Sequence, residues 1–238
     1  MFNFNFYFSL ISVLASVGAG AYFLVYWFAN GRKDSYLLWW AFGFASLYIF
    51  KIPNVLINAG FHIVQTDVYP VLYFGLLLYL ISHYAFVRGL ASWIHNLNEP
   101  TVTGFFAVMF FSAVIYLCLS FFAPGGTMSA PVWGSNALFY IPIQIFILYK
   151  LAQAAKEVVE SYAISHVGLI LTSLGMLALV ASSILYILVQ VGRYPRAFWY
   201  LAVVNTPIVS IVQIAAVALL FFGFHSFLQN KSREEVVG

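Results

Sequence analysis

Long runs of apolar residues alternate with short polar segments along the whole chain. A transmembrane helix needs about 20 mostly apolar residues, and seven runs reach that length. Turn-forming or charged segments such as Pro124-Gly125-Gly126 separate them. The second run is the least regular, because Lys51 and Pro53 interrupt it. The pattern predicts an all-α polytopic bundle of seven transmembrane helices at about residues 6–29, 36–59, 68–90, 102–123, 132–154, 164–191 and 197–228.

The composition indicates that lipid surrounds most of the folded surface. Of the 238 residues, 63% are hydrophobic and only 7% are charged, whereas a soluble domain has about 25% charged residues. The formal charge of +3 is too small and too scattered for nucleic-acid binding. Cys118 is the single cysteine, which excludes an internal disulfide, a thiolate zinc site and a Cys-ligated iron–sulfur cluster.

Lysine and arginine residues predict the orientation of the bundle, because cytoplasmic connections are enriched in them. The predicted outer side has only two basic residues, Arg193 and Arg196. The sequence therefore predicts an outside N-terminus, a seven-helix domain over 1–228 and a short, frayed, polar cytoplasmic tail over 229–238. We expect a multi-pass protein of the cytoplasmic membrane of a prokaryote. The basic residues of the predicted cytoplasmic side are Arg32, Lys33, Arg88, Lys150, Lys156, Lys231 and Arg233.

Small residues recur at helical spacing on the first and sixth spans. Ser12, Ser16 and Gly20 follow one another at intervals of four on the first span. Because small side chains let helices approach closely in lipid, both stripes predict helix–helix contact faces. The stripe on the sixth span consists of Ser165, Gly168, Thr172, Gly175 and Ser182.

The second span has the most unusual polar group of the chain. A lysine inside a membrane segment is costly and marks a candidate functional site. Lys51, Asn54 and Asn58 share one helix face, and Asp67 opens the third span across a short outer connection. One interpretation is an outward-facing polar pocket for an anionic or carbonyl ligand. The other is that the helix ends at Ile52 and that Lys51 meets the lipid headgroups.

A second polar cluster surrounds Pro207 on the seventh span. Asn205 and Thr206 precede the proline, and Ser210 and Gln213 lie on the same helix face as Thr206. These side chains could hydrogen-bond neighbouring helices and support a proline kink. Alternatively, they line a binding cavity together with the Lys51 cluster, since both clusters fall in the outer half of the predicted bundle.

Three histidines, His83, His166 and His225, fall near the predicted cytoplasmic ends of their spans. Three imidazoles at one depth could bind zinc, and two could ligate a haem. No pair has i, i+4 spacing, however, and no acidic residue lies within a span as a partner. The chain also has no GxSxG, GxxxxGK[ST] or HExxH motif, so we do not expect an enzyme.

The leading hypothesis is a non-enzymatic integral membrane protein in contact with membrane lipid. It is either a subunit of a larger membrane assembly, with partner chains or in a homo-oligomer, or a sensor of a small ligand or lipid. A small transporter or channel with a polar cavity in its outer half is the first alternative. A haem- or metal-binding electron carrier is the second.

Overall fold

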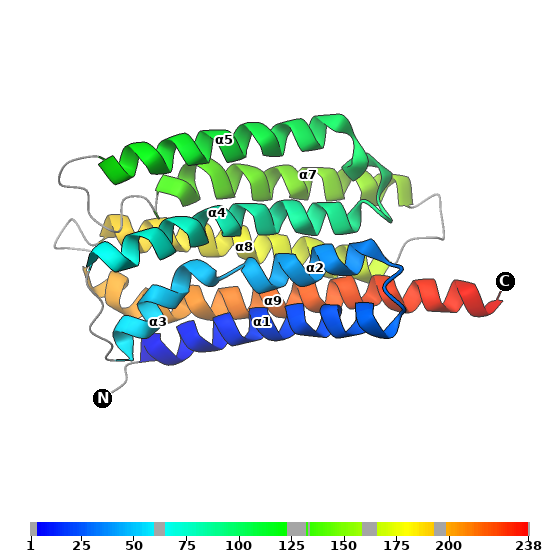
Figure 1. Cartoon of the computed structure of the whole chain (residues 1–238), viewed down its shortest axis with the longest axis horizontal. Helices are drawn as coiled ribbons and strands as arrows, with labels where there is room; N and C mark the ends of the chain where they lie inside the picture. The colour runs from blue at the N-terminus through cyan, green and yellow to red at the C-terminus, as the bar shows by residue number, and fades with distance from the viewer. Residues whose placement is uncertain are drawn as a thin grey trace.

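In the computed structural model, the described part of the chain consists of residues 4–59, 65–122, 132, 134–158, 166–192 and 199–237, and all its regular structure is helical (Figure 1). The long helices lie roughly parallel or antiparallel in one bundle. The elements are α1 (Phe4–Ala29), α2 (Ser35–Ser46), η1 (Ile49–Lys51), α3 (Ile52–Asn58), α4 (Gln65–Leu90), η2 (His95–Asn98), α5 (Pro100–Phe122), η3 (Asn136–Tyr140), α7 (Ile141–Val158), α8 (His166–Gly192) and α9 (Trp199–Val237).

Among the described residues, six helices are long and apolar enough to cross a bilayer, which confirms a helical fold compatible with a multi-pass membrane protein. They correspond to the first and the third to seventh of the predicted spans. The six spans are Phe6–Ala29, Pro70–Leu90, Pro100–Phe122, Asn136–Ala155, His166–Leu188 and Pro207–Gln229.

The predicted second span is not one continuous helix. α2 ends at Ser46, the 3-10 turn η1 follows, and α3 begins at Ile52. Pro53 has no amide hydrogen and cannot donate to the carbonyl of Ile49, so a regular α-helix is interrupted there. The amide of Lys51 bonds instead to the carbonyl of Tyr48 at 3.0 Å. The interruption leaves two short helices, each below the length of a membrane span.

Small residues form close helix contacts at both predicted stripes. Gly20 of α1 faces the backbone of α2, where an added Cβ would lie 2.7 Å from the carbonyl oxygen of Ala41. Ser16 is buried beside it and donates a hydrogen bond to the carbonyl of Phe44. On the sixth span, a Cβ at Gly175 would lie 2.7 Å from Cγ of Leu220 on α9. These contacts confirm the two faces as packing surfaces; Ser165 lies outside the described residues.

Stacked aromatic rings fill the bundle interior near one end. The indole of Trp40 is fully buried between Phe224, at 4.6 Å between ring centroids, and Trp93, at 5.0 Å. Phe23 and Phe44 extend this cluster across α1 and α2. Aromatic pairs of this kind contribute beyond the area that they bury. The cluster packs α2 against α1 and α9.

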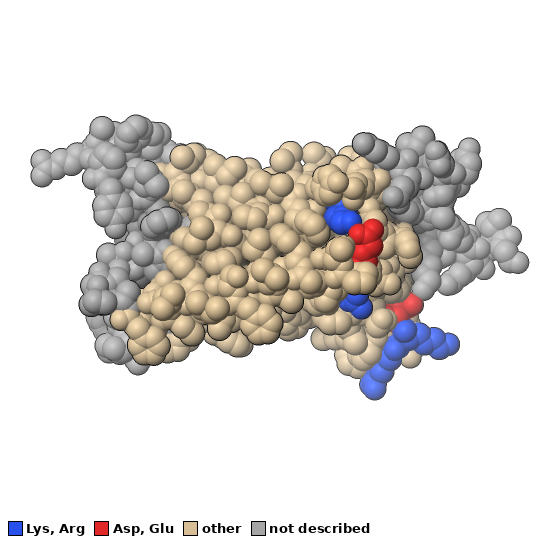
Figure 2. All heavy atoms as spheres, turned by 90° about the horizontal axis from the view of Figure 1, so that it is seen from above, with Lys and Arg blue, Asp and Glu red and all other residues tan. Residues whose placement is uncertain are grey.

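Apart from Lys51, the charged side chains of the described residues gather at the same end of the molecule (Figure 2). Arg32 and Lys33 lie in the turn between α1 and α2, and Arg88 lies in the last turn of α4. Lys150 of α7 pairs there with Glu99 at 2.7 Å. α9 continues as a helix through the segment 229–237 and projects beyond the other helices (Figure 1).

Candidate functional site

Lys51 joins three helical elements inside the bundle. Its ammonium Nζ donates to the hydroxyl of Ser12 on α1 at 3.0 Å and to that of Ser210 on α9 at 3.4 Å. Both serines are buried, with 0% and 4% of their surface exposed. The Nζ atom also lies 5.0 Å from the ring centroid of Tyr48, within the range of a cation–π contact. The side chain thus points into the bundle, not along a helix toward the headgroups.

The break in the second span gives Lys51 this position. Tyr48, one turn earlier, is 1% exposed and donates its hydroxyl to the main-chain carbonyl of Gln213 on α9 at 3.3 Å. On the other side, α4 approaches η1 at Gly75, where an added Cβ would lie 2.5 Å from Cα of Phe50. η1 therefore lies between α4 and α9. Its last residue, Lys51, points toward α1 and α9.

The ammonium group retains hydrogen-bonding capacity in this position. Lys51 has three donor hydrogens, and the two serine hydroxyls accept two of them. Ser12 donates its own hydrogen to the carbonyl of Ser9 at 2.8 Å, so its oxygen is free to accept. Among the described side chains, no carboxylate pairs with Lys51, and the amide oxygen of buried Gln213 has no hydrogen-bond partner. A charge solvated only by neutral groups attracts an anion strongly.

The predicted site residues divide into two groups. Ser210 and Gln213 are brought together with Lys51, Ser210 directly and Gln213 through Tyr48. The side chains of Asn54, Asn58, Asp67, Asn205 and Thr206 lie outside the described part of the chain. Sequence reasoning assigned Ser12 to a packing stripe and missed its contact with Lys51. The position of Ser12 on a polar face of the first span could have indicated this contact.

A second buried polar cluster, also missed, links α4 to α7. The amide nitrogen of Gln144 lies 3.1 Å from Nε2 of His83 and 3.2 Å from the hydroxyl of Tyr79. Nδ1 of His83 lies 2.7 Å from the main-chain oxygen of Tyr79, which places the imidazole hydrogen on Nδ1 and leaves Nε2 to accept from Gln144. Tyr140, in the π-helical turn η3, donates to the carbonyl of Leu76 at 2.8 Å. These bonds position helices and satisfy buried polar groups.

The three histidines do not meet. His83 is fully buried with Gln144, His166 is exposed at the start of α8, and His225 contacts Tyr22 and Gln229. Within the described residues, no three His, Cys, Asp or Glu side chains are grouped closely enough to bind a metal ion. The shared zinc site weighed from the sequence is therefore not formed by these histidines.

The Lys51 cluster, formed by Lys51, Ser12, Ser210, Tyr48 and Gln213, offers one cation and several neutral polar groups. A cation surrounded by neutral donors and acceptors can bind an anionic group. No protein-family model, curated protein or solved structure matches this chain.

Proposed function

We propose that this chain spans the membrane seven times, with the segment from α2 through η1 to α3 as a discontinuous second span. α2 has fully buried side chains at Leu37, Trp40 and Phe44, and it packs between α1 and α4. α2 and α3 together follow the length of α1 (Figure 1). A broken helix is tolerated at membrane depth where protein covers it. Its packing inside the bundle supports this assignment.

The charge distribution supports an orientation with the N-terminus outside. Arg32, Lys33, Arg88 and Lys150 all lie at the end of the bundle opposite the start of α1. Basic connections stay in the cytoplasm. We infer that this end is cytoplasmic and that the Lys51 cluster lies in the outer half of the membrane.

We propose that the protein is a non-enzymatic membrane module that binds a small anionic ligand at Lys51. The observation that supports this most is the ammonium group held by two serine hydroxyls, with no carboxylate beside it among the described side chains. An intramembrane lysine costs a few kcal/mol and is retained mainly where it has a function. A carboxylate or phosphate would accept the third hydrogen of Nζ and offset that cost.

The experiment is a thermal-shift measurement on the purified full chain in one detergent, with octanoate, acetate and inorganic phosphate as probes. A ligand at 100 times its Kd stabilises a protein by about 2.7 kcal/mol. We expect at least one anion to raise the unfolding temperature of the wild type and of Lys33→Met, an exposed lysine at the bundle end. Lys51→Met should abolish the shift. An equal shift in Lys51→Met would refute binding at this site, and so would the absence of a shift with all three anions.

A role as a subunit of a membrane assembly is the second candidate. α5 packs loosely, with only 17% of its span buried inside the bundle. Its outer stripe is available to a partner chain or a second copy. Purification in a mild detergent should then yield a stoichiometric complex, whereas a lone monomer would contradict a subunit role. The exposed large side chains of this stripe are Val108, Phe111, Ile115, Leu119 and Phe122.

Transport remains a variant of the ligand-binding proposal, because a transporter would use the same cluster. Liposome uptake of a radiolabelled anion that produces a thermal shift separates the two functions. Uptake that Lys51→Met abolishes would favour transport, whereas binding without uptake would favour a sensor or a subunit. For the haem- or metal-carrier alternative, an optical spectrum and metal analysis of the pure protein are decisive.

A further inference from the structure

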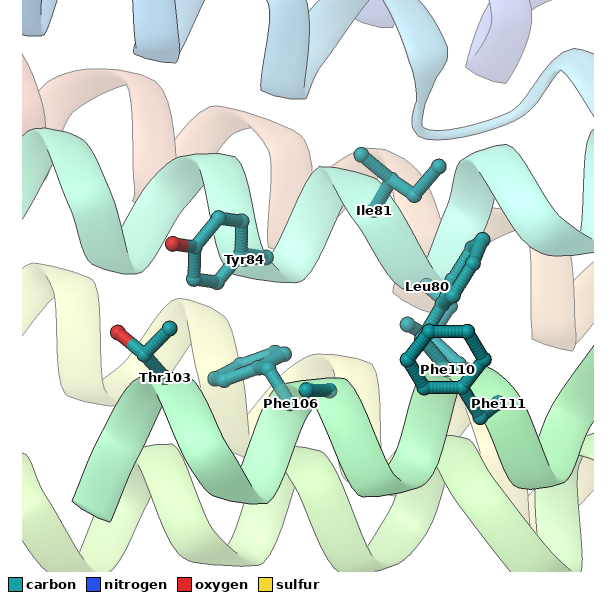
Figure 3. A pocket seen from close by; sticks show the side chains of 8 residues that line it. Leu80, Ile81, Tyr84, Thr103, Phe106, Phe110 and Phe111 are labelled. Carbon is teal, nitrogen blue, oxygen red and sulfur yellow. The ribbon is translucent and has the colours of Figure 1, made fainter. Parts of the chain in front are cut away.

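An apolar groove of about 330 Å³ opens between α4 and α5. Leu80 and Ile81 line it from α4, and Phe106 and Phe110 line it from α5 (Figure 3). Two hydroxyl side chains, Tyr84 and Thr103, lie at the same end of the groove, and the far end is apolar. The groove therefore has a defined polar end.

Aromatic side chains hold α5 against α4 and α7 beside the groove. Phe105 stacks on Phe146 of α7 at 4.2 Å between ring centroids, and Phe106 contacts Tyr84 at 5.3 Å. Ala107 lines the groove and has only a methyl group to fill the space. From Thr103 to Phe111, α5 lines the groove over about 12 Å, at 1.5 Å per residue. That length matches most of the roughly 15 Å hydrocarbon depth of one leaflet.

A cation lies beyond the polar end of the groove. Arg88 follows Tyr84 by one helical turn on α4, and its guanidinium donates to the side-chain oxygen of Asn98 at 3.2 Å, just before α5 begins. Arg88 thus links α4 to η2, the turn that precedes α5. Among the described residues it forms no ion pair, since the nearby carboxylate of Glu99 bonds to Lys150. Guanidinium groups with free donors bind phosphate groups well.

We propose that this groove binds one acyl chain of an anionic membrane phospholipid, with the lipid phosphate at Arg88. The apolar walls take the chain, the hydroxyls of Tyr84 and Thr103 face the glycerol ester region, and Arg88 binds the phosphate. Arg88 and the apolar groove follow one another in the same order as the headgroup and the acyl chain of a phospholipid. The end with Arg88 lies toward the basic end of the bundle. The site is separate from the Lys51 cluster and depends only on membrane insertion of the chain.

The test is native mass spectrometry of the full chain in detergent, titrated with dioleoyl-phosphatidylglycerol or dioleoyl-phosphatidylcholine. The wild type should bind one phosphatidylglycerol in preference to phosphatidylcholine by roughly fivefold, the effect of about 1 kcal/mol per basic residue at an anionic surface. Ala107→Trp fills the groove and should remove the bound lipid of both kinds. Val108→Trp, on the adjacent exposed position, is the matched control and should bind as the wild type does.

Arg88→Gln tests the headgroup contact. Its amide can still bond to Asn98, so the contact between α4 and η2 stays, but the preference for phosphatidylglycerol should fall to near unity. Arg32→Gln, in the exposed turn at the same end, should keep the preference. Equal lipid binding by Ala107→Trp and Val108→Trp would refute the groove as the acyl-chain site. An unchanged preference in Arg88→Gln would refute the phosphate contact. Failure of either variant would leave the anion site at Lys51 unaffected.

Discussion

The contact between α1 and α2 can be tested with one methyl group. In Gly20→Ala, the new Cβ would lie 2.7 Å from the carbonyl oxygen of Ala41 and 2.9 Å from the amide nitrogen of Ala45. Ordinary contacts of a Cβ are 3.4–4 Å, and both neighbours are backbone atoms that cannot rotate away. α1 and α2 must therefore separate by about 0.5–1 Å, and overpacking of this kind costs about 1–3 kcal/mol.

Gly18→Ala is the matched control on the same helix. An added Cβ at Gly18 meets nothing within 4 Å, so this variant only gains helix propensity, worth about 0.8–1.0 kcal/mol in soluble helices. Gly20→Ala gains the same propensity, and the difference between the two variants isolates the steric cost. At roughly 2–4 °C per kcal/mol for a chain of this length, Gly20→Ala should unfold several degrees below Gly18→Ala.

The assay is thermal unfolding of both variants in one detergent, followed by tryptophan fluorescence, because Trp40 lies in the core beside this contact. Equal unfolding temperatures for the two variants would refute the close approach of α1 and α2.

Three further contacts are tested by substitution. Gly75→Ala should destabilise the protein by about 1–3 kcal/mol, because its Cβ would meet the backbone of η1. Gly104→Ala is the control, since an added Cβ there meets nothing within 4 Å and should not destabilise the protein. Thermal unfolding of both variants measures the difference. Tyr140→Phe should cost about 1 kcal/mol through the lost hydrogen bond to α4, measured in the same way. The Lys150 ammonium holds the pKa of the exposed Glu99 carboxyl below its ordinary value. The pair therefore stabilises the folded protein above about pH 4.5, and this contribution is lost as the pH falls through the lowered pKa. Glu99→Gln should unfold at a lower temperature than the wild type at pH 7, and the difference should vanish in acid; a constant difference would contradict the ion pair.

Much of the bundle could be predicted from the sequence, because the length of an apolar run is set by the membrane and requires no tertiary information. Six of the predicted spans are long apolar helices in the structure. The second span differs because the cost of a regular helix at Lys51 and Pro53 depends on what surrounds it. A 3-10 turn satisfies the backbone there, and α4 approaches this turn closely at Gly75.

The polar contacts were predicted less completely. Lys51 was identified by its cost in lipid, but its partners come from spans distant in the sequence, and helix periodicity does not reveal which faces meet. Ser12, at 0% exposure, looked like any small residue of a packing stripe. Gln144 was missed because a single amide in an apolar span has no motif. Its pairing with His83 requires the packing of α4 against α7.

The position of Lys51 inside the bundle is tested most directly by the thermal stability of Lys51→Met and Lys51→Asp in one detergent. Lys33→Met and Lys33→Asp are measured beside them as controls. Met should keep the fold and its stability, because it fills similar space without a buried charge. Asp should cost several kcal/mol, since it leaves a carboxylate among neutral groups, whereas both substitutions at exposed Lys33 should change stability by less than about 0.5 kcal/mol. Equal unfolding temperatures for the wild type, Lys51→Met and Lys51→Asp would show that Lys51 lies in water or headgroups and would contradict the anion site.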